Sequence, residues 1–86
     1  MKSFQFTVRD ELGIHARPAG LFAKLAKTYN GTVITITKAG KTVKASQLMK
    51  LMGLAVKNGD EVTVSAEGPD EEAAISALEL FFQENL

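Results

Sequence analysis

The sequence predicts an α+β fold in which helices cover one face of an antiparallel sheet. Stretches with apolar residues at alternate positions are interleaved with stretches whose apolar residues recur at helical spacing, in the order β-α-β-β-α-β-α. The outer positions of the predicted strands are rich in Thr and Ser, which is typical of a sheet with one solvated face. At 86 residues we expect one domain, residues 1–86, with a small core.

The first two elements are a strand and an amphipathic helix. Residues 2 to 8 alternate, which predicts a strand with one buried face. Residues 16 to 28 predict a helix, in which Leu25 lies at the edge of the apolar stripe and Leu21 lies outside it. The inward-facing residues of these two elements are Phe4, Phe6, Val8, Ala19, Phe22, Ala23 and Ala26. Asn30 and Gly31 tolerate the left-handed conformation that ends a helix, so the chain is expected to turn there.

A β-hairpin is predicted next. Residues 32 to 37 are β-branched throughout, which favours a strand, with Ile34 and Ile36 on its buried face. Ala39 and Gly40 are expected at the hairpin tip, before a short strand at residues 41 to 44.

Residues 46 to 56 predict a second helix with more apolar residues than one face can bury. We expect Leu48, Leu51 and Ala55 to face the core, which leaves Met49 and Met52 partly exposed. Either the whole set is core and the helix is short, or the methionines form an exposed patch for varied partners. Periodicity does not decide between these two interpretations.

The last two elements are a strand and a helix. Residues 61 to 66 predict a strand with Val62, Val64 and Ala66 inward. Asp70 and the two glutamates that follow suit the positive N-terminus of a helix. Its predicted buried side is Ala74, Ile75, Leu78, Phe81 and Phe82.

Composition excludes several classes of function. Ten basic and ten acidic side chains balance, which argues against a nucleic-acid or anionic-membrane surface. The middle strands carry Thr and Ile in place of stacking aromatics, which also argues against an RNA-recognition domain. There is no cysteine and only one histidine, so neither a disulfide framework nor a metal site is expected. No apolar run approaches the ~20 residues of a membrane span, and we expect a cytoplasmic protein without membrane insertion.

The single histidine lies where the first strand leads into the first helix. The free N–H groups at a helix N-terminus, together with the helix dipole, form an anion site. Arg17 adds a planar cation suited to phosphate, and Pro18 fits the first turn. His15 is therefore interpreted as a nucleophile that carries a phosphoryl group, the alternative being an ordinary surface or capping residue.

The stretch Gly13-Ile14-His15-Ala16-Arg17-Pro18-Ala19 resembles the signature of the histidine-containing phosphocarrier (HPr) family of the bacterial phosphoenolpyruvate:sugar phosphotransferase system. Residues 45 to 56 and 59 to 68 also resemble family segments, so the similarity covers essentially the whole chain. The resemblance implies an open-faced β-sandwich with four strands and three helices.

The resemblance also implies a function. Such proteins accept a phosphoryl group on histidine from phospho-enzyme I and pass it to enzyme IIA components, without a cofactor and as monomers. A carrier of the nitrogen-related phosphotransferase system and a regulatory protein that only binds partners are the alternatives. A self-contained enzyme is not expected from so short a chain.

By resemblance, His15 and Arg17 are the catalytic residues, and the amides of Ala16 and Arg17 with the Arg17 guanidinium bind phosphate. The implied partner surface is Ala16, Gly20, Leu21, Leu48, Met49 and Met52, although a larger side chain is usual in the family at Gly20. In one branch of the family a regulatory serine directly precedes the second helix. Its sequence number suits Ser46, but the local pattern places Gln47 at that position, so Ser46 is instead expected to cap the helix.

Overall fold

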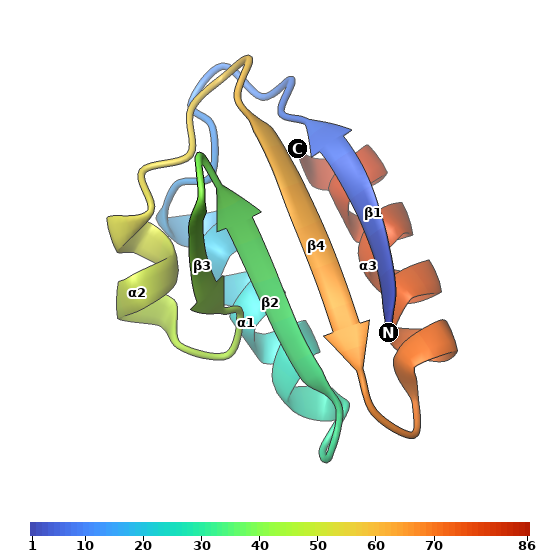
Figure 1. Ribbon diagram of the computed structural model, residues 1–86. Helices are drawn as coiled ribbons and strands as arrows, with labels where there is room; N and C mark the ends of the chain where they lie inside the picture. Colours follow the sequence, from blue (N-terminus) through green and yellow to red (C-terminus); the bar gives the residue numbers. More distant parts are fainter.

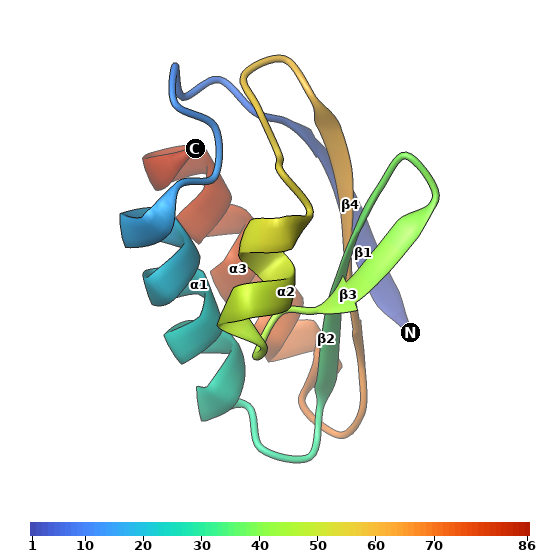
Figure 2. The same cartoon turned by 90° about the vertical axis from the view of Figure 1, so that its left-hand side faces the viewer.

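The computed structural model describes all residues, 1–86, and contains four strands and three helices. In chain order these are β1 (Lys2–Thr7), α1 (Ala16–Thr28), β2 (Val33–Lys38), β3 (Lys41–Lys44), α2 (Leu48–Gly53), β4 (Glu61–Glu67) and α3 (Glu71–Asn85). The strands form one antiparallel sheet in the order β1-β4-β2-β3, and all three helices lie on the same face (Figures 1 and 2). None of the helices is long and apolar enough to cross a membrane.

The core lies between the covered face of the sheet and α1 and α3. Phe22 of α1 and Phe82 of α3 are fully buried, and their rings meet edge to face with centroids 5.1 Å apart. Phe4 and Phe6 of β1 pack against the same Phe82 ring, also edge to face. This geometry suits the quadrupoles of aromatic rings and fixes α1 and α3 relative to the sheet. The α+β prediction, an open-faced sandwich with the order β-α-β-β-α-β-α, is confirmed.

The hairpin between β2 and β3 turns at the predicted residues. Ala39 and Gly40 have φ of 49° and 83°. Positive φ at both central residues is typical of a type I′ turn, whose backbone twist matches that of the two flanking strands in a two-residue hairpin. The opposed side chains of Thr37 and Thr42 share a 2.7 Å hydrogen bond on the open face of the sheet.

The second helix is shorter than predicted, and two residues expected in the core are exposed. α2 spans only Leu48–Gly53. Leu48 is 41% exposed, and Ala55 lies on the surface with a positive φ of 55°, beyond the helix end. Leu51 is buried as predicted, and Leu54 is buried with it. Because the segment has more apolar side chains than one face can bury, its periodicity could not identify the buried face.

Candidate functional site

His15 occupies the N-cap position of α1. Its backbone is extended, with φ −100° and ψ −175°, and its side chain makes no capping hydrogen bond. The carbonyl oxygen of His15 accepts the N–H of Ala19 at 2.9 Å, so the residue begins the helix through its backbone alone. The imidazole, whose side chain is 37% exposed, is therefore available for chemistry.

The amides beside His15 are those that a helix N-terminus leaves without partners. Ala19 already donates to His15, and Pro18 has no N–H. The N–H groups of Ala16 and Arg17 therefore remain for an anion, and the positive end of the helix dipole lies at the same place. Arg17 is exposed and takes part in none of the ion pairs of the chain.

A shallow cleft of about 220 Å³ opens next to the imidazole. Nε2 of His15 lies 4.0 Å from a carboxylate oxygen of Asp10. That same oxygen accepts the N–H of Leu12 at 2.8 Å, which holds the carboxylate in place. The residues that line the cleft are Asp10, His15, Arg17, Pro18, Leu21 and Asn85. The cleft is thus a small, open site that carries both signs of charge.

The loop before His15 is held against the segment that follows α2. Gly13 is buried with φ +67°, and a Cβ there would collide with the backbone of Val56 and Lys57. The N–H of Ile14 donates to the carbonyl oxygen of Val56 at 3.0 Å. Because Val56 lies three residues beyond the end of α2, this bond brings the C-terminal end of α2 close to His15.

The predicted partner residues are mostly exposed, and they lie on two helices that pack side by side (Figure 2). On α1, Ala16 is exposed and Leu21 is 47% exposed. Gly20 is half-buried, and a Cβ built there would meet open space. On α2, Met49 is 83% exposed and Met52 36%. These apolar side chains, together with Leu48, lie on the outside of the α1–α2 layer.

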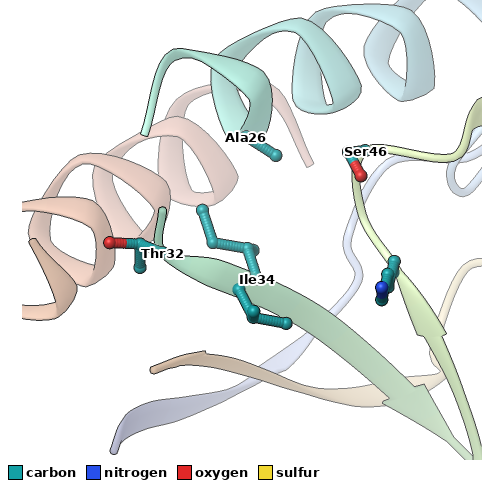
Figure 3. Close-up of a pocket in the computed structure, with 6 residues that line it drawn as sticks. Ala26, Thr32, Ile34 and Ser46 are labelled. Atoms are coloured by element: carbon teal, nitrogen blue, oxygen red, sulfur yellow. The ribbon is translucent and has the colours of Figure 1, made fainter. Parts of the chain in front are cut away.

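Ser46 does not cap α2, contrary to the prediction. The N-cap residue is Gln47, and no side chain makes a capping hydrogen bond there. Ser46 instead lines a depression of about 150 Å³ between α1, β2 and the end of β3, with Ala26, Thr32 and Ile34 among its neighbours (Figure 3). The residue at the helix start is thus Gln47, the position that the sequence pattern assigns to the family serine.

Sequence reasoning missed Asp10 and Asn85 in the cleft. Asp10 falls in a segment that reads only as a polar connection, and no spacing rule links it to His15. Asn85 reaches the cleft from the far end of the chain, at the end of α3, so no local signal could indicate it.

Comparison with known proteins identifies the family. A family model described as the PTS HPr component phosphorylation site matches residues 2–84. The phosphocarrier protein HPr of Mycoplasma genitalium is 33% identical over 85 residues, which cover 99% of this chain and 97% of the relative. A crystal structure of HPr from Thermoanaerobacter tengcongensis superposes with a TM-score of 0.92 at 39% identity, covering 98% of this chain and 93% of that one.

A third match is to a protein described as a dimer. The crystal structure of Crh from Bacillus subtilis, described as a domain-swapped dimer, matches with a TM-score of 0.77 at 42% identity, covering 92% of this chain and 90% of that one. The full-length family match, the sequence identity and the shared fold agree, and the chain belongs to the HPr family, the phosphoryl carriers of the phosphotransferase system.

Proposed function

We propose that His15 is the residue that carries the phosphoryl group. The observation that carries this proposal is an imidazole with no hydrogen bond, placed at a helix N-terminus beside the amides of Ala16 and Arg17. An imidazole supplies the nucleophile, and the amides supply oriented donors for the phosphate oxygens.

The attacking atom is proposed to be Nδ1 of the neutral imidazole. Nδ1 is the ring nitrogen nearer the backbone of His15, whereas Nε2 lies 4.0 Å from the carboxylate of Asp10. That carboxylate favours the tautomer with its proton on Nε2 and repels a phosphate from that side. Nδ1 keeps its lone pair for attack on phosphorus.

The transfer is an in-line displacement between two histidines. Nδ1 of His15 forms a bond to the phosphorus of phospho-enzyme I as the donor's P–N bond breaks, and the electron pair of that bond returns to the donor imidazole. The charge on the transferred group is offset by the amides of Ala16 and Arg17 and by the Arg17 guanidinium. The same steps in reverse deliver the group to an enzyme IIA component.

An open site suits a carrier because the group must leave again. The cleft beside His15 is shallow, and Arg17 is not fixed by any ion pair, so the phosphate is held without being enclosed. A deep pocket would stabilise the phosphorylated form and slow the second transfer.

Enzyme I and enzyme IIA components are proposed to dock on one face around His15. The face consists of Ala16, Gly20, Leu21, Leu48, Met49 and Met52, and exposed methionines adapt to more than one partner. Using a single face for donor and acceptor fits a carrier that meets them in turn.

The carrier is further proposed to act as a cytoplasmic monomer of one domain, residues 1–86. The phosphoryl group originates from phosphoenolpyruvate, a cytoplasmic metabolite. β1 pairs with β4 of its own chain from Lys2↔Ala66 to Thr7↔Glu61, so the sheet needs no strand from a second copy. Sedimentation equilibrium at micromolar concentration tests this state, and a dimer there would contradict it.

The function is tested by phosphorylation from phosphoenolpyruvate and purified enzyme I. The wild-type chain should take up one acid-labile phosphoryl group, and His15→Ala should take up none. The phosphorylated protein is then mixed with a sugar-specific enzyme IIA and, separately, with an enzyme IIA of the nitrogen-related system. Transfer to the sugar-specific component is expected, whereas phosphate uptake by His15→Ala would refute the assignment.

A further inference from the structure

Lys38, at the end of β2, joins three groups that lie far from it in sequence. Its ammonium donates to the carbonyl oxygen of Ala55 at 2.7 Å and lies 3.5 Å from that of Leu54. It also lies 2.9 Å from a carboxylate oxygen of Asp60. The two carbonyls belong to the residues that directly follow α2, where a cation is favoured by the negative end of the helix dipole. One ammonium therefore fastens the hairpin strand to the end of α2 and to the start of β4.

Asp60 completes this arrangement from the other side. The carboxylate oxygen that meets Lys38 also accepts the N–H of Lys57 at 2.8 Å. The backbone N–H of Asp60 donates back to the carbonyl oxygen of Lys57 at 3.0 Å. The hydrogen bond from Lys57, followed by that from Lys38, lowers the pKa of Asp60, so the carboxylate is charged at neutral pH. Lys38 and Asp60 thus define the shape of the turn between α2 and β4.

The loop that carries His15 is hydrogen-bonded to this same turn at both ends. At the near end, the N–H of Ile14 donates to Val56, and Gly13 packs directly on the Val56–Lys57 backbone. At the far end, the N–H of Gly59 donates to the carbonyl oxygen of Val8 at 2.8 Å. The position of His15 is therefore set by the turn rather than by α1 alone.

The turn itself contains a backbone conformation that is unfavourable for residues with a Cβ. Ala55 has φ +55°, which lies in the left-handed region that favours glycine. The carbonyl of this residue is the closest acceptor of Lys38, so the strained peptide is held by a charge-assisted hydrogen bond. Without that bond, the chain between α2 and β4 is free to relax toward ordinary conformations.

We propose that Lys38, paired with Asp60, is a positioning residue for phosphoryl transfer: by fixing the turn of residues 54–60 it holds His15 and the exposed face of α2 in one arrangement. The proposal rests on the proposed role of His15. Lys38 touches neither His15 nor phosphate, and it acts through the Ala55–Val56–Ile14 backbone.

Amide exchange tests the positioning directly, in the absence of any partner. Lys38→Met keeps the length of the side chain but loses its donors. Its control is Lys41→Met, because Lys41 is the cross-strand partner of Lys38 in the hairpin and enters no salt bridge or side-chain hydrogen bond. We expect the Ile14 amide to exchange about tenfold faster in Lys38→Met than in the control. The amide of Val64, in the core strand β4, should be unchanged.

Transfer from phospho-enzyme I provides the second measurement. Lys38→Met should lower the maximal rate several-fold, and Lys38→Arg should recover part of it because Arg keeps the charge and the donors. Asp60→Asn removes the ion pair but keeps an acceptor for the Lys57 N–H. It should show the same pattern more weakly, and it serves as the test if Lys38→Met does not fold.

Two results would overturn the proposal. One is equal Ile14 exchange and equal transfer rates in Lys38→Met and Lys41→Met, or wild-type behaviour of Asp60→Asn where that variant replaces it. The other is a loss of protection at the Val64 amide of Lys38→Met that equals the loss at the Ile14 amide, because this would indicate general destabilisation of the fold. Because exchange needs no donor, failure here is distinct from failure of the proposed function, which is decided by phosphate uptake in His15→Ala.

Discussion

The carbonyl oxygen of Val56 lies where a side chain on Gly13 would have to begin. This close approach lets Ile14 form its hydrogen bond to the same carbonyl, and it sets the loop that ends at His15. Gly13 has no side chain that could bind phosphate, but its contact with Val56 helps to position His15.

Gly13→Ala is expected to destabilise the fold strongly. The new methyl group combines the left-handed φ of +67° with a clash against backbone that cannot rotate away. The two effects together should cost at least about 2 kcal/mol, or roughly 10 °C in Tm. Thermal unfolding followed by circular dichroism measures this cost. Gly59→Ala is the control, since Gly59 has φ +88° but open space around it, and equal losses in both variants would contradict the role of the Val56 contact.

Ala55→Gly is expected to stabilise the protein. Glycine adopts the φ of +55° without steric cost, and this gain of roughly 1–2 kcal/mol exceeds the ~0.5–1 kcal/mol that glycine adds in chain entropy. A rise in Tm of roughly 4 °C should result. The same substitution at Ala77, inside α3, should instead destabilise by about 1 kcal/mol. If Ala55→Gly lowers Tm as Ala77→Gly does, the backbone at residue 55 is not strained.

The strands and the first and last helices could be predicted because each has one buried face. Phe22 and Ala26 share a stripe, as do Leu78 and Phe82, and the structure buries all four. α2 could not be delimited, because alanine normally favours helix and Ala55 gives no sign that it lies beyond the helix end. His15 could be proposed as the nucleophile from local chemistry, whereas Asp10, Asn85 and the link through Lys38 depend on contacts that only the folded chain creates.

Arg17→Ala is expected to slow phosphoryl transfer while leaving the fold intact. Arg17 is exposed and makes no ion pair, so its removal opens no cavity. Loss of a charge-assisted hydrogen bond to phosphate should reduce the transfer rate from phospho-enzyme I about tenfold or more. The control is Lys24→Ala, an exposed cation two turns further along α1. Equal transfer rates for the two variants would contradict a role for Arg17 in binding the phosphate.

Met49→Ala is expected to weaken docking of partners without weakening the fold. The side chain is 83% exposed, so nothing in the free protein depends on it. If it is buried by enzyme I, its loss should raise the half-saturating concentration for transfer about fivefold, with the maximal rate unchanged. Leu80→Ala is the matched control, since Leu80 is 55% exposed but lies on α3. A rise of the same size in Leu80→Ala would place the docking surface elsewhere.

Ser46 is expected to be a poor substrate for an ATP-dependent HPr kinase. The N-cap of α2 is Gln47, so a phosphate on Ser46 would lie one residue before the free amides that could stabilise it. The Ser46 side chain also lines the depression beside Ala26 and Thr32 (Figure 3), which leaves it only partly accessible. Incubation with purified kinase and labelled ATP should therefore leave the wild-type chain unlabelled. Gln47→Ser places a hydroxyl at the cap and should gain phosphorylation. Efficient labelling of the wild type that Ser46→Ala abolishes would contradict the prediction. It would show that the kinase accepts a serine that lies one residue before the N-cap of α2.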